Sequence, residues 1–365
     1  MAIEVFSFFS GLGFMDLGVE TAGFNVSFVN EYNHSFLQAY QYARRFRTQC
    51  PKYGYYEGSM EVFLNDDVWN TRFPDYSVRE KDRLIGFVGG PPCPDFSAAG
   101  KNAGSTGENG QLTEKYVQLI VKRQPDFFVL ENVKGLYQTK KHKTFYEQMK
   151  RRLYRAGYSV FDSIENALEY GVPQFRDRLI LVGLNRKRFG KNLKYTIGVH
   201  KIYDINDIRQ CNWPTINEFE IGNVRNEPEN IIRKLTVEYW FRLNNVLNHP
   251  NSNDYFNVIA NDKFTTIPEG DTSKKSFKRL HRWRYSPTAA YGNNEVHLHP
   301  YQPRRISVAE ALAIQSLPDW FEVMPTLSLA AKFKMVSNGV PYLLAKGIAS
   351  DLYEWLKEYE QQEES

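Results

Sequence analysis

The first half of the chain alternates apolar runs with amphipathic stretches, and this alternation constrains its fold more than any other feature. Apolar runs predict strands at residues 3–9, 24–29, 84–88, 127–130 and 179–184. Helical patterns predict helices at residues 14–22, 114–122 and 144–157. Because strands that alternate with helices form parallel sheets covered on both faces, we expect an α/β fold with a doubly wound, mostly parallel sheet.

Length and composition are typical of a soluble protein with two domains. The chain has 365 residues, of which 42% are hydrophobic and 24% charged, enough apolar material to bury a sizeable core. No apolar run approaches the ~20 residues of a membrane helix. Three well-separated cysteines suit neither a disulfide framework nor a zinc site. We therefore expect a cytoplasmic protein that binds no metal, while the net charge of +4 identifies no partner by itself.

The residues least typical of a core stand where the predicted strands end. These residues are Gly11, Gly13, Glu31, Cys93 and Glu131. In parallel α/β sheets, ligands bind in the crevice outside the carboxyl ends of the strands. We therefore expect a binding site at that edge of the sheet.

The turn at residues 10–13, Ser-Gly-Leu-Gly, follows the first predicted strand and lets a nucleotide approach the backbone. A turn that binds pyrophosphate would have a third glycine at position 16, where Asp16 places a carboxylate that repels phosphate. The turn thus favours a nucleoside without phosphates, such as S-adenosylmethionine, over NAD. Glu31 would then accept hydrogen bonds from the ribose hydroxyls. The alternative interpretation is a tight turn beside a surface acid.

The segment at residues 89–97, Gly-Gly-Pro-Pro-Cys-Pro-Asp-Phe-Ser, holds a thiol at a strand end. Prolines on both sides of Cys93 restrict the backbone, and a cysteine thiolate is intrinsically very nucleophilic. This pattern is typical of a positioned nucleophile. Cys50 and Cys211 have no such setting, and we interpret them as small buried hydrophobic residues.

Glu131 and two arginines supply further reactive groups. Glu131 follows an apolar strand, where partial burial raises a carboxyl pKa and allows the group to donate a proton or a hydrogen bond. Its alternative role is to cap the next helix. Strand alternation places Arg176 and Arg178 on one face and Asp177 on the other. The two arginines suit a phosphate or a polar base edge, or else form an exposed ion-pair face.

The chain changes character from about residue 185 to residue 303. Asparagine and charged residues dominate there, and the apolar periodicity weakens. A helical pattern returns at residues 308–315, and Leu344, Ile348, Leu352 and Leu356 then recur at every fourth position. We expect this last helix to pack on the first domain, which makes the middle region an inserted second domain.

Together and in this order, these segments resemble the DNA cytosine-5 methyltransferase family, of the restriction–modification type. The resemblance covers nearly the whole chain outside the middle region. It rests on residues 9–13, 30–32, 91–97, 131–133, 174–178, 304–318 and 337–341. It implies the Rossmann-like fold of class I S-adenosylmethionine-dependent methyltransferases, with a catalytic domain at residues 1–185 and 328–365. Residues 186–327 would form a smaller, inserted target recognition domain that binds DNA.

The resemblance implies that a methyl group passes from S-adenosylmethionine to carbon 5 of a cytosine flipped out of duplex DNA. It assigns Cys93 to a covalent bond with carbon 6 and Glu131 to ring nitrogen 3. Arg178 would face the base, and Arg176 a neighbouring phosphate or the loop that carries the thiol. The implied cofactor-binding residues are Phe9, Ser10, Gly11, Leu12, Gly13, Glu31, Tyr32, Pro92, Leu112 and Asn338.

A basic and aromatic segment, residues 272–294, contains no acidic residue and is expected on the DNA face. Lysine and arginine neutralise phosphates and make affinity salt-dependent. The expected DNA contacts are Lys101, Lys274, Lys275, Lys278, Arg279, Arg282, Arg284 and Arg304. A second cluster after Glu131 would hold phosphates near the flipped nucleotide and comprises Lys134, Lys140, Lys141 and Lys143. The alternative for such charge runs is a solvated surface.

Three positions depart from the family's pattern. Pro94 stands where a glutamine usually follows the nucleophile, and Ser337 replaces the glycine before Asn338. Ser59 stands where an acid usually meets the adenine amino group, and Glu57 or Glu61 is the expected substitute.

Two other functions compete with DNA methylation. A tRNA cytosine-5 methyltransferase would carry a Cys-Phe-Thr tripeptide, which this sequence lacks. A catalytically inactive DNA-binding homologue would explain the three departures, but the presence of Cys93 and Glu131 favours an enzyme. The expected partners are double-stranded DNA and a cognate restriction endonuclease that acts separately, and we expect a monomer.

Overall fold

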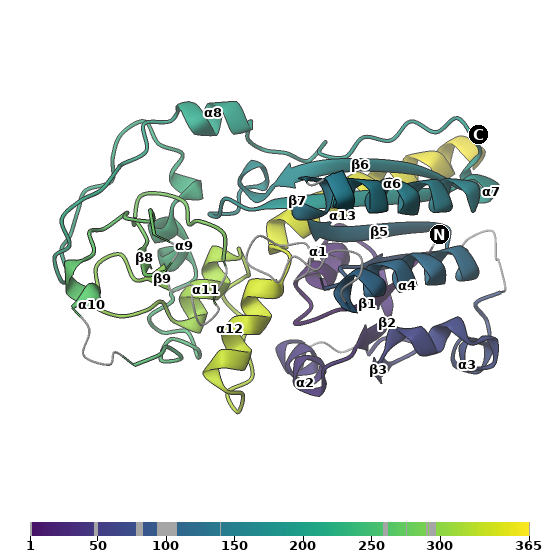
Figure 1. Ribbon diagram of the computed structural model, residues 1–365, viewed down its shortest axis with the longest axis horizontal. Helices are drawn as coiled ribbons and strands as arrows, with labels where there is room; N and C mark the ends of the chain where they lie inside the picture. Colours follow the sequence, from purple (N-terminus) through teal and green to yellow (C-terminus); the bar gives the residue numbers. More distant parts are fainter. Residues whose placement is uncertain are drawn as a thin grey trace.

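The computed structural model describes residues 2–46, 50–77, 83–92, 108–138, 140–257, 262–274, 276–289, 291 and 297–364. These residues form two lobes that lie side by side (Figure 1). One lobe holds a large sheet with helices on both faces, and the other consists of short elements joined by long loops. The C-terminal helix returns to the sheet, as the apolar repeat of its sequence predicts.

The described part of the first lobe contains a seven-stranded sheet with the strand order β3-β2-β1-β4-β5-β7-β6. The strands are β1 Ala2–Phe8, β2 Asn25–Glu31, β3 Tyr55–Glu57, β4 Arg83–Gly89, β5 Phe127–Val133, β6 Tyr158–Asn166 and β7 Asp177–Asn185. From β3 to β5 all neighbours are parallel, whereas β7 is antiparallel to both β5 and β6. The expected mostly parallel sheet is confirmed, with an antiparallel pair at one edge.

Helices cover both faces of this sheet, and each face has its own apolar core. One core joins the sheet to three helices: α1 Phe14–Ala22, α2 His34–Ala43 and α13 Tyr342–Glu364. The other core is rich in aromatic rings and involves η1 Met60–Leu64, α3 Asp66–Arg72, α4 Glu108–Arg123 and α6 Lys140–Arg155. A sheet covered on both faces needs near-continuous apolar strands, and residues 3–9 and 84–88 have that pattern.

Short elements complete the two lobes. Beside the sheet are α5 Gly135–Gln138, η4 Ala167–Tyr170 and α7 Arg186–Phe189. The second lobe contains α8 Ile205–Gln210, η5 Arg233–Leu235, α9 Val237–Leu243, α10 Lys263–Thr266, β8 Lys278–Arg279 and β9 His297–Leu298. The chain then forms α11 Val308–Ile314 and α12 Leu329–Asn338 on its way back to the sheet.

Apolar packing links the two lobes. Residues of α11 and α12 share one core with Phe14 and Leu17 of α1 and with Val237 and Phe241 of α9. The segment after β7 also packs on the first lobe, because Phe189 and Tyr195 belong to the core beneath α13.

Most predicted elements are present, and the exceptions have physical reasons. Helix α1 spans residues 14–22 as expected, because Gly13 and Gly23 take left-handed conformations at its two ends. The short strand β3 and the strand β6 were not predicted. Most of β6 is only half-buried, so polar residues interrupt its apolar pattern. The interpretation of Cys50 as a buried hydrophobic residue is wrong, since Cys50 is exposed, and Cys211 is only partly buried.

No helix among the described residues is long and apolar enough to cross a membrane.

We expect Gly86→Ala to destabilise the sheet lobe. A Cβ at position 86 of β4 would lie 2.0 Å from the ring of Phe127 on β5, so that ring must move within a filled core. Overpacking of this kind costs roughly 1–3 kcal/mol. Urea unfolding measures the loss, with Asn25→Ala at the exposed start of β2 as the control. An unchanged unfolding midpoint for Gly86→Ala would contradict this packing.

Candidate active site

The carboxyl ends of the parallel strands form one edge of the sheet, and Glu31 and Glu131 lie there with Arg178. Both chain termini lie at the end of the first lobe farther from the second lobe (Figure 1), so β1 runs from that end toward the second lobe. Strand β7 runs in the opposite direction and begins at this edge. Its Arg178 therefore pairs in register with Val133 of β5, two residues beyond Glu131.

The loop after β1 is a turn that requires glycine. Gly11 and Gly13 have φ angles of 56° and 81°, in the left-handed region, and Phe9 has a φ angle of 56°. Apart from its chain neighbours, none of the described residues has an atom within 4 Å of the point where a Cβ of Gly11 would be, so this side of the turn is open toward them. The amide of Gly13 donates to the carbonyl of Ser10 and closes the turn.

Glu31 at the end of β2 is tied to this turn. One carboxylate oxygen accepts from the Gly11 amide at 2.8 Å, and the other accepts from the Asn33 amide at 2.9 Å. Burial raises the pKa of Glu31, and the backbone amides oppose that increase. Each carboxylate oxygen can accept more than one hydrogen bond, so Glu31 can still bind a hydroxyl group. The alternative of a surface acid does not hold, because Glu31 is buried.

Glu131 forms a buried ion pair that crosses from β5 to β7. Its Oε1 lies 2.7 Å from Nε of Arg178, and both side chains are almost entirely buried. Burial raises the pKa of Glu131, whereas the charges of Arg178 and Arg176 oppose the increase. A Cβ on Gly90 would lie 2.7 Å from Oε2 of Glu131, so a larger residue would require the carboxylate to move. The carboxyl group therefore borders the start of the segment that carries Cys93.

Arg176 is buried, and its hydrogen bonds join the segment before β7 to the part of the chain that returns from the second lobe to the sheet. Its Nη1 donates to the carbonyl of Ala289 at 3.0 Å, and its Nη2 donates to Ser337 at 2.8 Å and to Gly339 at 3.2 Å. Burial and the charge of Arg178 hold the pKa of Arg176 well below its usual range. An exposed ion-pair face is therefore excluded for Arg176, whose described contacts are structural.

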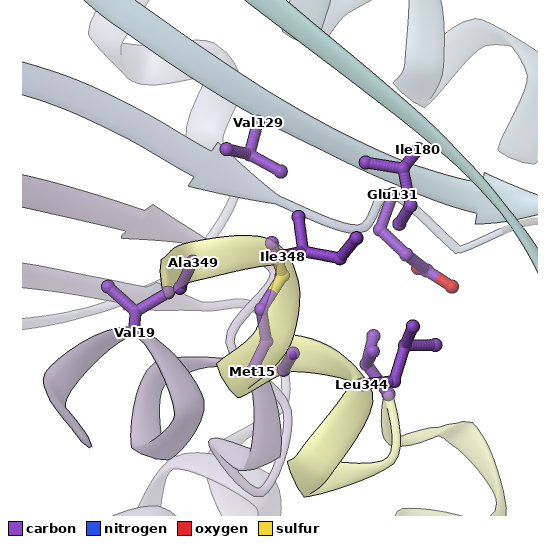
Figure 2. A pocket seen from close by; sticks show the side chains of 10 residues that line it. Met15, Val19, Val129, Glu131, Ile180, Leu344, Ile348 and Ala349 are labelled. Carbon is purple, nitrogen blue, oxygen red and sulfur yellow. The ribbon is translucent and has the colours of Figure 1, made fainter. Parts of the chain in front are cut away.

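A small apolar cavity adjoins Glu131 between α1, α13 and strands β5 and β7 (Figure 2). Its volume is about 20 Å³, and Glu131 is its one ionisable lining residue among those described. Figure 2 shows Glu131 at one end, with its carboxylate directed away from Val19 and Ala349. Such a cavity holds about one water molecule, so it is no cofactor pocket. The apolar side chains that line it contribute to the desolvation of Glu131.

Four buried polar atoms near the strand ends have no hydrogen-bond partner among the described residues. They are Ser10 Oγ, Tyr116 Oη, Asn132 Nδ2 and Arg176 Nε. A buried polar group without a partner costs free energy, so each of these atoms suits a contact with a bound ligand. Together with the open side of Gly11, they fit a nucleoside cofactor at this edge.

The remaining cofactor candidates surround the same edge. Phe9 packs edge-on against Tyr116 of α4 at 5.6 Å between ring centroids, and Leu112 lies one turn before Tyr116. Tyr32 and Asn338 are exposed at the ends of β2 and α12, and Pro92 is exposed after β4. Sequence patterns did not single out Tyr116, since a tyrosine in an amphipathic helix is usually a core residue.

Three predicted site residues lie outside the described residues: Cys93, Lys101 and Lys275. The backbone is described as far as Pro92 on one side of the thiol and from residue 108 on the other.

Three arginines expected to contact DNA are instead occupied within the protein, which corrects that assignment. Arg279 is fully buried, and its guanidinium donates to the carbonyls of Ile267, His299, Gln302 and Phe264. Arg282 makes a buried two-pronged ion pair with Glu269. Arg304 does the same with Glu310. Sequence patterns cannot separate such arginines from exposed ones, because burial depends on the tertiary fold.

The other basic candidates are more accessible. Lys274 is exposed, and Lys278 and Arg284 are partly buried. In the second cluster, Lys134 pairs with Asp177 at 2.9 Å and Lys143 lies over the ring of Tyr137, while the side chains of Lys140 and Lys141 are outside the description.

The acids expected to substitute at the adenine position already have partners. Glu57 binds His34 at 2.7 Å, and Glu61 lies 3.4 Å from Lys115. Ser59 caps the η1 helix by accepting from the amide of Glu61. The described residues contain no group of three or more His, Cys, Asp or Glu side chains that could hold a metal ion.

Comparison with known proteins identifies the family. The sequence model described as C-5 cytosine-specific DNA methylase matches residues 3–354. The chain belongs to this family. The chain is 52% identical to the type II methyltransferase M.NmeDI of Neisseria meningitidis serogroup C over 359 residues, which cover 97% of this chain and 84% of that protein. It is 28% identical to the type II methyltransferase M.FnuDI of Fusobacterium nucleatum, over 98% of this chain and 96% of that protein.

Solved structures confirm the class I methyltransferase fold of this methylase. A putative DNA modification methyltransferase encoded within an E. coli prophage superposes with a TM-score of 0.63 at 21% identity, over 98% of this chain and 100% of that chain. The S. pombe Dnmt2 methyltransferase superposes with a TM-score of 0.60 at 13% identity, over 97% of this chain and 98% of that chain. At these identities the likeness concerns the fold alone.

We expect Arg178→Met to raise the pKa of Glu131 further, because Arg178 is the foremost influence that opposes the effect of burial. NMR titration of ¹³C-labelled glutamate carboxyls in the methylase measures this pKa, with Glu131→Gln to assign the resonance. Arg178→Lys keeps the charge and is the control.

The same change alters stability with a defined sign. A carboxyl whose pKa is higher in the folded than in the unfolded state contributes fully below the unfolded value of about 4.3. That contribution is lost as the pH rises through the folded pKa. Because its folded pKa is the higher one, Arg178→Met should lose more stability than Arg178→Lys as the pH rises from about 4.3 through the folded pKa. A lower pKa for Glu131 in Arg178→Met would contradict the ion pair.

Proposed function

We propose that this methylase transfers a methyl group from S-adenosylmethionine to carbon 5 of a cytosine flipped out of a specific duplex DNA sequence, as the modification enzyme of a restriction–modification system. The observation that carries the proposal is the buried Glu131–Arg178 pair beside Gly90. It places a carboxyl group with a raised pKa next to the segment that leads to a cysteine. The family membership and the 52% identity to a type II methyltransferase support the reaction class.

Cys93 is the proposed nucleophile. Gly90 borders the carboxyl group of Glu131, and Cys93 follows three residues later. Three residues of extended chain span at most about 10 Å, and this short separation in sequence supports the assignment. Its thiolate adds to carbon 6 of cytosine, and the displaced π electrons reach carbon 5 as an enamine. Carbon 5 would then take the methyl group as its bond to the sulfonium sulfur breaks and the sulfur leaves as a thioether. Carbon 5 loses its proton to a base, and the thiolate leaves as the 5,6 double bond returns.

Glu131 and Arg178 stabilise the base during that addition. A carboxyl with a raised pKa donates a proton or hydrogen bond to ring nitrogen 3, where negative charge develops. Arg178 Nε holds the carboxyl in place, and the guanidinium is proposed to face the base. The described Nη1 bond of Arg178 goes to the carbonyl of Asp177. We propose that Arg176 fixes the segment before β7 and does not bind a phosphate, because both of its Nη atoms already donate to backbone carbonyls.

The turn at residues 10–13 and Glu31 are proposed to hold the cofactor. S-adenosylmethionine would supply an electrophilic methyl group on a sulfonium. Glu31 accepts hydrogen bonds from the ribose hydroxyls while it keeps its hydrogen bond from the Gly11 amide. Phe9, Leu12, Tyr32, Pro92, Leu112 and Asn338 line the remainder of the pocket. Ser10 Oγ and Tyr116 Oη supply polar contacts, since both are buried without a partner among the described residues.

The second lobe is proposed as the DNA recognition domain. A base stacked in a duplex cannot reach a thiol at the strand edge, so the nucleotide must be extruded at a cost of a few kcal/mol. We propose that this domain begins after the segment that packs beneath α13, and that residues 328–365 complete the catalytic domain. Lys274, Lys278 and Arg284 are the proposed phosphate contacts, together with Lys101 and Lys275, which lie outside the described residues.

Duplex DNA is the proposed partner, and a cognate restriction endonuclease acts on the same sequence separately. The methylase is proposed to work as a monomer in the cytoplasm of a prokaryotic cell, where its substrate lies. Membership of the DNA methylase family favours DNA over tRNA as the substrate.

We expect Cys93→Ser to abolish methyl transfer and leave DNA affinity within a few-fold of the wild type, because a hydroxyl is a far weaker nucleophile than a thiol. Radiolabelled methyl transfer to duplex DNA and to tRNA, with gel-shift titrations, measures both properties. Duplex DNA containing 5-fluorocytosine should trap the wild-type protein as a covalent adduct at residue 93, visible by mass spectrometry.

Cys50→Ser and Cys211→Ser are the matched controls and should methylate normally. Unchanged turnover in Cys93→Ser, or methyl transfer to tRNA alone, would overturn the proposed reaction.

We expect the double variant Lys274→Gln, Arg284→Gln to bind DNA more weakly and with less dependence on salt. Each lost phosphate contact lowers the slope of log affinity against log salt by about 0.9, so the slope should fall by about 2. Fluorescence anisotropy over a range of salt concentrations measures it. The control is the double variant Lys191→Gln, Lys194→Gln. It removes the same amount of positive charge at exposed positions after α7 and should keep the wild-type slope. Equal slopes for the wild type and both double variants would show that Lys274 and Arg284 do not contact DNA phosphates.

A further inference from the structure

A buried arginine lies directly under the turn at residues 10–13. Arg44, which follows α2, donates from Nη2 to the carbonyl of Gly13 at 2.6 Å and from Nη1 to the carbonyl of Leu12 at 3.4 Å. Its side chain is 5% exposed, and its guanidinium lies 3.9 Å from the centroid of the Tyr40 ring. A Cβ on Gly13 would lie 2.4 Å from Nη1, so the turn fits directly onto this group.

Two acids of α1 neutralise this cation. Asp16 is buried and accepts hydrogen bonds from Ser7 at 2.7 Å and from Tyr40 at 2.8 Å. Glu20 lies 3.7 Å from Nε of Arg44. Asp16 therefore faces the protein interior beneath the turn, whereas the sequence suggested that its carboxylate repels phosphate from the ligand side. Its hydrogen bonds to β1 and α2 explain that direction.

The position of Arg44 is electrostatically unfavourable on its own. The N-terminus of a helix carries partial positive charge and favours anions, yet a buried cation contacts the carbonyl of Gly13, the N-cap residue of α1. Gly13 has no side chain to cap the helix. The arrangement persists because Asp16 and Glu20 offset the charge. A buried arginine with its donors on two consecutive loop carbonyls acts on the loop.

We propose that Arg44 is a positioning residue for the cofactor, which sets the conformation of the turn before S-adenosylmethionine binds. This inference rests on the proposed function. Glycine populates both signs of φ almost equally, so Gly11 and Gly13 do not define the turn by themselves. In a trans peptide the carbonyl and the amide point in opposite directions. When Arg44 holds the carbonyls of Leu12 and Gly13 below the turn, it orients both peptide planes and keeps the open side of Gly11 toward the ligand.

Preorganisation of this kind strengthens binding because the loop is already ordered when the ligand arrives. Arg44→Met keeps most of the volume and removes the donors. We expect it to weaken S-adenosylmethionine binding about tenfold, the usual scale for a lost charged hydrogen bond. DNA affinity should stay within about twofold of the wild type, and kcat should recover at saturating cofactor, so that the loss appears in the KM for the cofactor.

Arg83→Met is the matched control. Arg83 is also a buried arginine of the first lobe, but its two-pronged ion pair with Glu4 lies at the start of β1, at the other end of the sheet. It should lower Tm to a similar extent and leave cofactor affinity unchanged. Equilibrium dialysis with radiolabelled S-adenosylmethionine measures affinity, and amide hydrogen exchange without cofactor measures order in the turn. Arg44→Met should speed exchange at residues 11–14, and Arg83→Met should not.

The outcomes separate the inference from the proposed function. A wild-type protein that binds no S-adenosylmethionine contradicts the proposed function, and the exchange measurement still decides whether Arg44 orders the turn. Cofactor affinity and exchange in Arg44→Met equal to those of the wild type overturn the inference. If Arg44→Met does not fold, Arg44→Lys decides. One ammonium cannot reproduce the planar guanidinium that spans two carbonyls, so weaker cofactor binding supports the inference and unchanged binding overturns it.

Discussion

The contact between Glu131 and Arg178 depends on the antiparallel strand β7, which lies between β5 and the edge strand β6, and the proposed chemistry of the site depends on that contact. A carboxyl alone among apolar side chains would be neutral at physiological pH, and a carboxyl next to two free arginines would be fully ionised. Glu131 lies between these limits because burial and the arginines oppose each other. Only a reversal of strand direction at β7 brings Arg178 to the same edge as the carboxyl ends of the parallel strands.

Glycine makes this crowded edge possible. Gly90 leaves space for Oε2 of Glu131, and Gly13 leaves space for Arg44 and Tyr40. In both places a charged side chain occupies the volume that a Cβ would need. These glycines therefore serve close approach between backbone and ionised groups, in addition to permitting the turn. The buried charges beneath the turn and beside Glu131 belong to separate networks, one for the loop and one for the proposed base pocket.

The second lobe uses much of its basic charge internally. Arg279, Arg282 and Arg304 bind carbonyls and buried carboxylates, so they stabilise a domain with little regular secondary structure. A lobe of short elements has few backbone ladders to hold it, and side-chain to backbone bonds replace them. Lys274 is exposed and Arg284 is partly buried, so both are more accessible to solvent than these three arginines. The net charge of a segment is thus a weak guide to its DNA-binding surface, because it counts buried and exposed groups alike.

Several features followed from the sequence by itself. Apolar runs with period-specific spacing predicted β1, β4, β5, β7, α1 and the closing helix, since local patterns reflect which side of an element is buried. The order of motifs predicted the family, and the positions of the strand ends predicted the edge at which Glu31 and Glu131 both lie. Tertiary structure alone decided which charged residues are buried. Arg44 and Asp16 are held by groups that belong to other elements of the fold. Nothing in the local sequence distinguishes the buried Arg279 from an exposed cation such as Lys274. Burial and pairing arise from contacts between distant segments, which no local pattern records.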